Sequence, residues 1–115
     1  MLARTWTTQI PEGREIEYDA SALSRSRWMF EQQPGCLGVL FLRAGASATV
    51  VSFWKDQESI DALASSDSYR QTASALVGSG AVGEPFTVTV FDVTGGFLAP
   101  SVIERLGVSS AAAAP

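Results

Sequence analysis

CLGVLFLRAGASATVVSFW, at residues 36–54, consists of two β-rich runs joined by a short turn that contains glycine. The runs at 36–42 and 48–54 are rich in apolar, β-branched and aromatic residues, which favour strands, and their spacing predicts a hairpin. A symmetric loop sets the pairing between the two strands. The facing pairs are Phe41 with Val50, Leu40 with Val51, and Gly38 with Phe53, whose ring would cover the glycine.

The residues before the hairpin predict one strand and one helix. Residues 2–9 mix β-branched, aromatic and polar side chains and end at the turn sequence PEG, which indicates a first strand. Residues 13–33 contain no proline and are followed by a Pro-Gly pair, which favours a helix that ends there. At about 100° per residue, the apolar stripe of this helix consists of Ile16, Ala20, Leu23 and Phe30. We expect this stripe to be buried.

The residues after the hairpin predict two further helices and a last strand. Asp56 is suited to cap a helix that turns Ile60 and Leu63 inward. A helix then restarts at the sequence SSD and has Tyr69 on its inner stripe, and the alternating residues 86–93 form the last strand. The order β-α-β-β-α-β predicts an α+β, ferredoxin-like fold, in which a four-stranded antiparallel sheet has both helical regions on one face.

The hairpin strands are apolar on both faces, although helices cover only one face of such a sheet. We expect a second copy of the chain to cover the other face, sheet against sheet, in a two-fold homodimer. The alternative is that the segment after Val93 folds back over it. Residues 1–93 are expected to form the α+β barrel domain, and 94–115 an extension with a short helix at 97–106 and an Ala-rich tail.

Composition and charge exclude several classes of function. The 115 residues suffice for one domain, and the net charge of −4 gives no electrostatic footprint for nucleic acid or an anionic membrane. The chain contains no histidine, which excludes Ser-His and Cys-His catalytic sites and histidine-ligated metal or haem. The single cysteine, Cys36, cannot form an internal disulfide, and no apolar run is long enough to span a membrane. These observations predict a cytoplasmic protein that holds no metal.

Three stretches of sequence, in the β-α-β-β-α-β order, resemble one family. They are PGCLG at 34–38, SFWKDQESIDAL at 52–63 and SSDSY at 65–69. In this order and spacing the chain resembles the antibiotic-biosynthesis monooxygenase family over residues 2–93. The resemblance implies a dimeric α+β barrel with a cavity between sheet and helices in each protomer. It also implies oxygenation of a small aromatic or polyketide-like substrate without metal or flavin cofactor.

The chain departs from the family pattern at several positions. Members commonly carry a histidine near the position of Ala62 and Leu63, and this chain has none. The haem-degrading branch uses an Asn, a Trp and a His that align near Trp6, Leu63 and Ala73, so we expect no haem degradation. Because fold does not fix function, two alternatives stay open. One is a non-catalytic protein that binds a small apolar ligand, and the other is a polyketide cyclase or isomerase.

Oxygenation without a cofactor needs an acidic phenol or enol, a group that takes its proton, a donor for the anion and a dry cavity. The candidate catalytic residues are Asp92 as a base, Tyr69 as a hydrogen-bond donor, and Arg27 as the cation for the anion. The candidate substrate-binding residues are Trp54, which could stack on a planar substrate, together with Trp6, Arg43 and the inward-facing Leu63. Structural alternatives are an ion pair for Arg27, a core position for Trp54 and a solvated strand end for Asp92.

Overall fold

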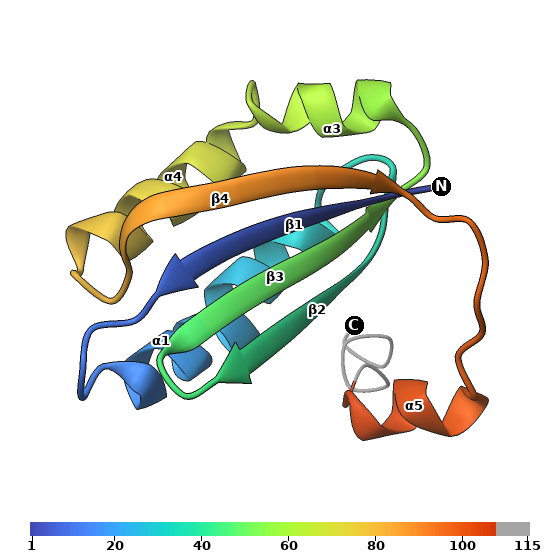
Figure 1. Ribbon diagram of the computed structural model, residues 1–115. Helices are drawn as coiled ribbons and strands as arrows, with labels where there is room; N and C mark the ends of the chain where they lie inside the picture. The colour runs from blue at the N-terminus through green and yellow to red at the C-terminus, as the bar shows by residue number, and fades with distance from the viewer. Residues whose placement is uncertain (108–115) are drawn as a thin grey trace.

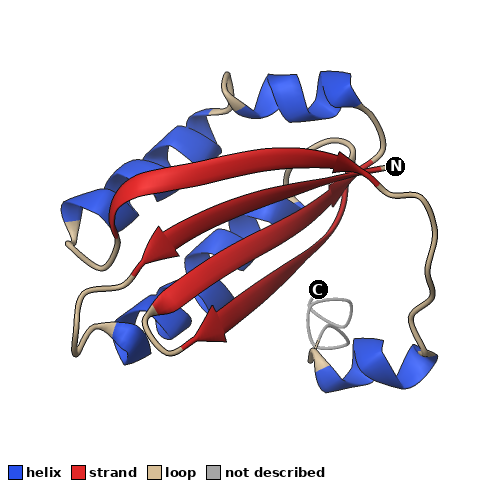
Figure 2. Ribbon diagram, viewed as in Figure 1, coloured by secondary structure: helices blue, strands red, loops and turns tan. Residues whose placement is uncertain are grey.

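The computed structural model describes residues 1–107 and has the predicted element order (Figure 1). The strands are β1 (Leu2–Gln9), β2 (Cys36–Ala44), β3 (Ser47–Trp54) and β4 (Gly83–Asp92). The helices are α1 (Glu15–Ser21), the π-helical turn η1 (Ala22–Ser26), α2 (Arg27–Glu31), α3 (Gln57–Leu63), α4 (Asp67–Gly78) and α5 (Pro100–Arg105). The strands form one antiparallel sheet in the order β2-β3-β1-β4, which confirms the ferredoxin-like α+β fold. Helices α1 to α4 lie on one face of this sheet (Figure 2).

The hairpin has the predicted register. Phe41 faces Val50, Leu40 faces Val51 and Gly38 faces Phe53 across β2 and β3. A Cβ atom added to Gly38 would lie 3.7 Å from the Phe53 ring, so the ring covers the glycine as expected. The register shifts between Cys36 and Gly38, where a bulge lets the edge strand follow the twist of the sheet.

The first helical region buries a different face from the one predicted. Ile16 and Leu23 are 85% and 62% exposed, whereas Tyr18, Ala22 and Met29 are buried, so the expected stripe was wrong except at Phe30. The cause is η1, because a π-helical turn takes up an extra residue and breaks the uniform rotation of about 100° per residue. The residues before and after this turn therefore do not follow one helical stripe.

The second helical region begins with the predicted cap at Asp56 and has a further cap at Ser66. The Asp56 side chain accepts a hydrogen bond from the Ser59 backbone N–H at 2.8 Å, and α3 buries Ile60 and Leu63. The Ser66 hydroxyl accepts one from the Tyr69 backbone N–H at 3.2 Å at the start of α4. Such caps satisfy backbone donors that the first helical turn leaves free.

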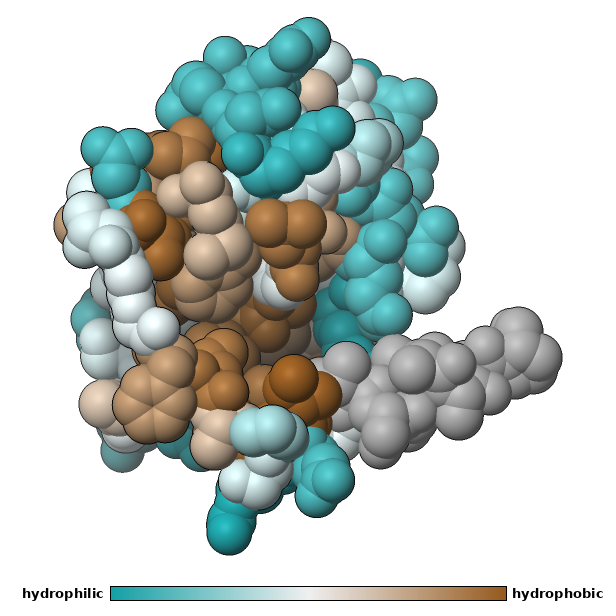
Figure 3. Space-filling view, turned by 90° about the vertical axis from the view of Figure 1, so that its right-hand side faces the viewer, coloured by the Kyte–Doolittle hydropathy of each residue, from teal (hydrophilic) through white to brown (hydrophobic). Residues whose placement is uncertain are grey.

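The core lies between the sheet and the helices, and among the described residues no helix packs onto the outer face of the sheet. Leu42 and Phe91 are half exposed on that face, and Phe53 lies in the same row as Phe91, with Ala3 between them. The outer face also carries Leu40 and Val51, and beside them five threonines: Thr5, Thr7, Thr49, Thr87 and Thr89. From the side at which α5 lies, apolar side chains gather in one continuous patch with hydrophilic neighbours (Figure 3).

Beyond β4 the chain runs as an extended arm to α5, which lies past the β2 edge of the sheet (Figure 1). Phe97 is 89% exposed and α5 has no buried residue, so this segment does not cover the outer face in one chain. The expected Ala-rich tail lies outside the described residues. Within the part of the chain described, no helix is both long and apolar enough to cross a membrane.

Candidate functional site

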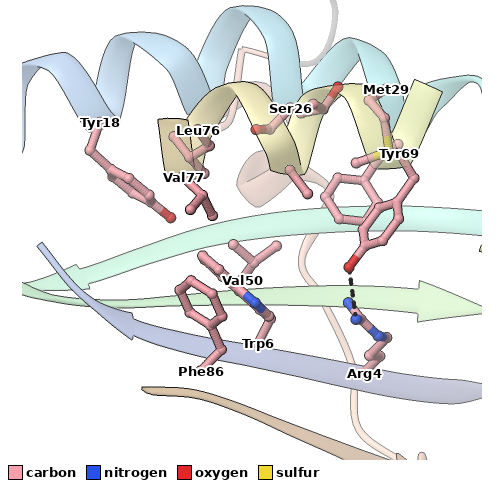
Figure 4. Close-up of a pocket in the computed structure, with 13 residues that line it drawn as sticks. Arg4, Trp6, Tyr18, Ser26, Met29, Val50, Tyr69, Leu76, Val77 and Phe86 are labelled. Carbon is pink, nitrogen blue, oxygen red and sulfur yellow. Dashed lines mark hydrogen bonds between the residues drawn. The ribbon is translucent and has the colours of Figure 1, made fainter. Parts of the chain in front are cut away.

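A cavity of about 160 Å³ lies between the inner face of the sheet and the helices. Its floor includes Arg4 and Trp6 of β1, and its roof includes Tyr18, Ser26 and Tyr69 from three helices (Figure 4). Most of the remaining lining is apolar and includes Met29, Phe30, Val50, Leu76, Val77 and Phe86. A mostly apolar hollow with a few converging polar groups is typical of a small-molecule site.

One end of the cavity holds a cation and a phenol. The Arg4 guanidinium Nη2 donates a hydrogen bond to the Tyr69 hydroxyl at 3.3 Å, and its Cζ lies 5.8 Å from the centroid of the same ring. Among the residues that the structure describes, no carboxylate lies within ion-pair distance of Arg4. An unpaired cation at the edge of an apolar cavity attracts an anion, because the apolar walls screen its charge less than water does.

Tyr69 is placed by a hydrogen-bonded cluster between α2 and α4. Gln33, at the end of α2, is 9% exposed, and its Nε2 lies within hydrogen-bond distance of the Ser66 and Ser68 hydroxyls at 3.1 and 3.0 Å. Ser66 also caps the Tyr69 backbone N–H. The cluster joins the segment after α2 to the start of α4, so it holds Tyr69 above Arg4.

The other end of the cavity holds Tyr18, whose ring points inward from α1 (Figure 4). Tyr18 is 3% exposed, and burial, with a smaller effect from the charge of Asp19, raises the pKa of its phenol to about 12. Burial disfavours the phenolate because the apolar surroundings solvate it poorly. Tyr18 is therefore a neutral hydrogen-bonding group at every pH at which the protein would work.

The raised pKa of Tyr18 predicts a loss of stability in alkali. Below pH 10 the phenol is neutral in both the folded and the unfolded protein. Between pH 10 and 12 it ionises in the unfolded chain but not in the folded protein. The free energy of unfolding therefore falls as pH rises. We expect phenolate absorbance of the native protein to contain a component that appears near pH 12 and is missing in Tyr18→Phe. Identical titration curves for the two proteins would contradict this.

The structure brings two of the sequence-derived candidates to the cavity and leaves five outside it. Tyr69 and Trp6 line it, and the Trp6 ring lies 5.1 Å from that of Phe86. Trp54 and Leu63 are buried in the core at 0% and 2% exposure.

Asp92 shares the strand face of Phe86, as its alternation predicted, but it is exposed because β4 is an edge strand that the helices do not cover to its end. The side-chain exposure of Arg27 is 22%, and its Nε lies 3.4 Å from Oε1 of Glu31, outside the cavity. Arg43 is exposed at the far end of the hairpin and pairs with Asp19 at 3.1 Å.

Sequence reasoning missed Arg4 and Tyr18. The alternation of β1 could have indicated Arg4, because it places Arg4 with Leu2 and Trp6 on the inner face of the strand. A charged residue is unusual on a buried strand face. Tyr18 was missed because a uniform helical period placed Ile16 inside instead.

The remaining groups with possible chemistry are separate from this cavity. Burial raises the pKa of the Cys36 thiol, which packs against the core cluster. In the described part of the chain, no group of three or more His, Cys, Asp or Glu residues could hold a metal ion.

A family model described as antibiotic biosynthesis monooxygenase matches residues 1–75. A comparison with curated protein sequences finds no match.

Solved structures share the fold. A Deinococcus radiodurans protein provisionally described as an antibiotic biosynthesis monooxygenase superposes with a TM-score of 0.69 at 13% identity, over 86% of this chain and 98% of its own. SnoaB, a cofactor-independent oxygenase from Streptomyces nogalater, has a TM-score of 0.68 at 15% identity, over 83% of this chain and 94% of its own. Rv0793 from Mycobacterium tuberculosis has a TM-score of 0.67 at 15% identity, over 83% of this chain and 96% of its own. The TM-scores establish a common fold. Because the identities are low, the function of the site has to be argued from its own residues.

Proposed function

Because the chain belongs to the antibiotic biosynthesis monooxygenase family, we propose that it oxygenates a small phenolic aromatic substrate with molecular oxygen and without a bound cofactor. The observation that supports this most directly is the unpaired Arg4 guanidinium beside the Tyr69 hydroxyl in an otherwise apolar cavity. SnoaB, which has the same fold, is a cofactor-independent oxygenase.

Arg4 and Tyr69 would bind the substrate as its anion. A phenol whose oxygen lies against the guanidinium loses its proton more readily, because the positive charge stabilises the phenolate. Among the residues whose side chains the structure describes, no carboxylate lines the cavity, and Arg4 and Tyr69 are both partly exposed, so the proton passes to solvent at this end. The Tyr69 hydroxyl donates a second hydrogen bond to the same oxygen.

The phenolate places electron density on the ring carbon that reacts with O2. For 1-naphthol, the carbon para to the oxygen forms a bond to O2, and the resulting hydroperoxide loses water to give 1,4-naphthoquinone. One oxygen atom of O2 becomes the new carbonyl. The other leaves as water, whose two hydrogens balance the loss of the hydroxyl proton and of the single hydrogen on the para carbon. The substrate loses the four electrons that O2 gains. Apolar walls such as Trp6 and Phe86 exclude water from the ring while admitting O2.

The test is to incubate the protein with 1-naphthol under oxygen-18 gas and to analyse the product by mass spectrometry. We expect 1,4-naphthoquinone with one labelled oxygen, formed faster than in buffer and in proportion to protein concentration. A rate equal to that of buffer, with 1-naphthol bound, would favour the alternative of a non-catalytic binding protein. The observation that supports this alternative is that the described lining of the cavity contains no carboxylate base.

We also propose that the protein is a homodimer in which the outer faces of two sheets pack together. The half-exposed Leu42 and Phe91 lie on that face, and α5 leaves it open. Burying such a face removes apolar surface from water. We expect light scattering to give about 24 kDa, twice the 12.2 kDa of one chain. Leu42→Lys should shift the mass toward one chain, and a stable monomer of the unaltered protein would contradict the proposal.

A further inference from the structure

Three hydroxyl groups face the cavity without a hydrogen-bond partner. They belong to Tyr18, Ser26 and Thr72, which are 3%, 9% and 8% exposed. Among the described residues, none of these hydroxyls has a hydrogen-bond partner, and no fully enclosed polar side-chain atom is unsatisfied. Their oxygen atoms are therefore not fully enclosed by protein, and all three residues line the cavity. Buried hydroxyls are normally paired, and a cavity lined by unpaired ones is suited to a ligand that pairs them.

Tyr18 is the hydroxyl with the clearest direction. Its ring enters from α1 at the opposite end of the cavity from Arg4 and Tyr69, with Trp6, Phe86 and the α4 side chains between the two ends (Figure 4). It packs in a core cluster with the apolar residues Ala22, Ala48 and Val82. A planar ligand whose anionic oxygen lies against Arg4 would therefore direct its far edge toward the Tyr18 hydroxyl.

We propose that Tyr18 is a specificity-determining residue that selects aromatic substrates with a second, neutral oxygen at the edge remote from the phenolate. This inference rests on the proposed function for the orientation of the ligand. The charge of the cavity is asymmetric among the described side chains, because the guanidinium is at one end and the polar groups at the other are neutral hydroxyls. The remote substituent is therefore a hydroxyl, carbonyl or ether and not a second anion, which would be buried without a counter-charge.

The experiment measures binding without oxygen, so that it does not depend on turnover. Anaerobic calorimetry compares 1-naphthol with 1,5-, 1,6- and 1,7-dihydroxynaphthalene on the full chain. We expect at least one diol to bind about 2- to 10-fold more tightly than 1-naphthol, which corresponds to one neutral hydrogen bond. In Tyr18→Phe this preference should disappear while the affinity for 1-naphthol stays the same. Tyr18→Phe should fold normally, because the hydroxyl it removes has no partner within the described structure.

Tyr69→Phe is the matched control, because it removes a phenolic hydroxyl from the other end of the same cavity. It should weaken every naphthol about equally and leave the preference for the diol unchanged. A preference that survives in Tyr18→Phe, or no diol that binds more tightly than 1-naphthol, would overturn the inference. If the preference is present and depends on Tyr18 but no naphthoquinone forms, the specificity role stands and the proposed oxygenation fails.

Discussion

Replacing Arg4 with methionine should weaken the binding of 1-naphthol by about 1.5–3 kcal/mol, or about 10- to 150-fold, at a pH at which the ligand binds as its anion. This is the usual contribution of a hydrogen bond to a charged group. Methionine keeps the aliphatic stem of the side chain on the inner face of β1 and removes only the guanidinium. Because Arg4 has no ion-pair partner among the described residues, no carboxylate is stranded, and the free energy of unfolding should stay the same or rise.

The control for Arg4→Met is Arg70→Met, which removes a cation from the exposed side of α4. Arg70 pairs with Asp67 on the surface and does not line the cavity. Surface ion pairs of this kind contribute little to stability, so both affinity and stability should stay close to those of the unaltered protein. Calorimetry gives the affinities, and urea denaturation gives the stabilities. Equal affinity of Arg4→Met and the unaltered protein for the naphtholate would remove Arg4 from the site and with it the main support for the proposed chemistry.

Trp54→Ala should lower the free energy of unfolding by about 3–5 kcal/mol, the usual cost of deleting a large buried aromatic side chain. Trp54 is 0% exposed and packs against Phe30, with ring centroids 6.4 Å apart and an interplanar angle of 66°. Its indole Nε1 donates a hydrogen bond to the Ser52 hydroxyl at 2.8 Å. Since domains of this size have a total stability of about 5–15 kcal/mol, the variant should be close to unfolding at physiological temperature.

Trp28→Ala is the control for this prediction, because Trp28 is 57% exposed and its loss leaves no internal cavity. Its effect should stay within about 0.5 kcal/mol, as for most surface substitutions. Urea denaturation followed by far-ultraviolet circular dichroism compares the two. Trp54→Phe should be intermediate, because it keeps most of the volume and loses the hydrogen bond to Ser52. A stable Trp54→Ala variant with a selective loss of naphthol binding would show that Trp54 contacts ligand, as the sequence alone allowed.

The parts of the site that could be predicted are those with a short-range signal. Tyr69 follows from the helix period after its Ser66 cap, and Trp6 from the alternation of β1. Arg4 lay on the same alternation, but its partner Tyr69 is 65 positions away in the chain, and no local pattern indicates that the two meet. For Asp92 the predicted strand face was correct, but the predicted partial burial was wrong. Its exposure depends on how far the helices extend over the edge strand.

The sequence by itself determined the order of the elements, the hairpin register from Gly38–Phe53 to Phe41–Val50, and the cap at Asp56. These features depend on residues that are near one another in the chain, so propensity, alternation and turn chemistry suffice. Only the tertiary structure decided which face of the first helical region is buried and which polar groups surround the cavity. One extra residue in the π-helical turn rotates a helix against the sheet, and that rotation brings Tyr18 inward and leaves Ile16 in solvent.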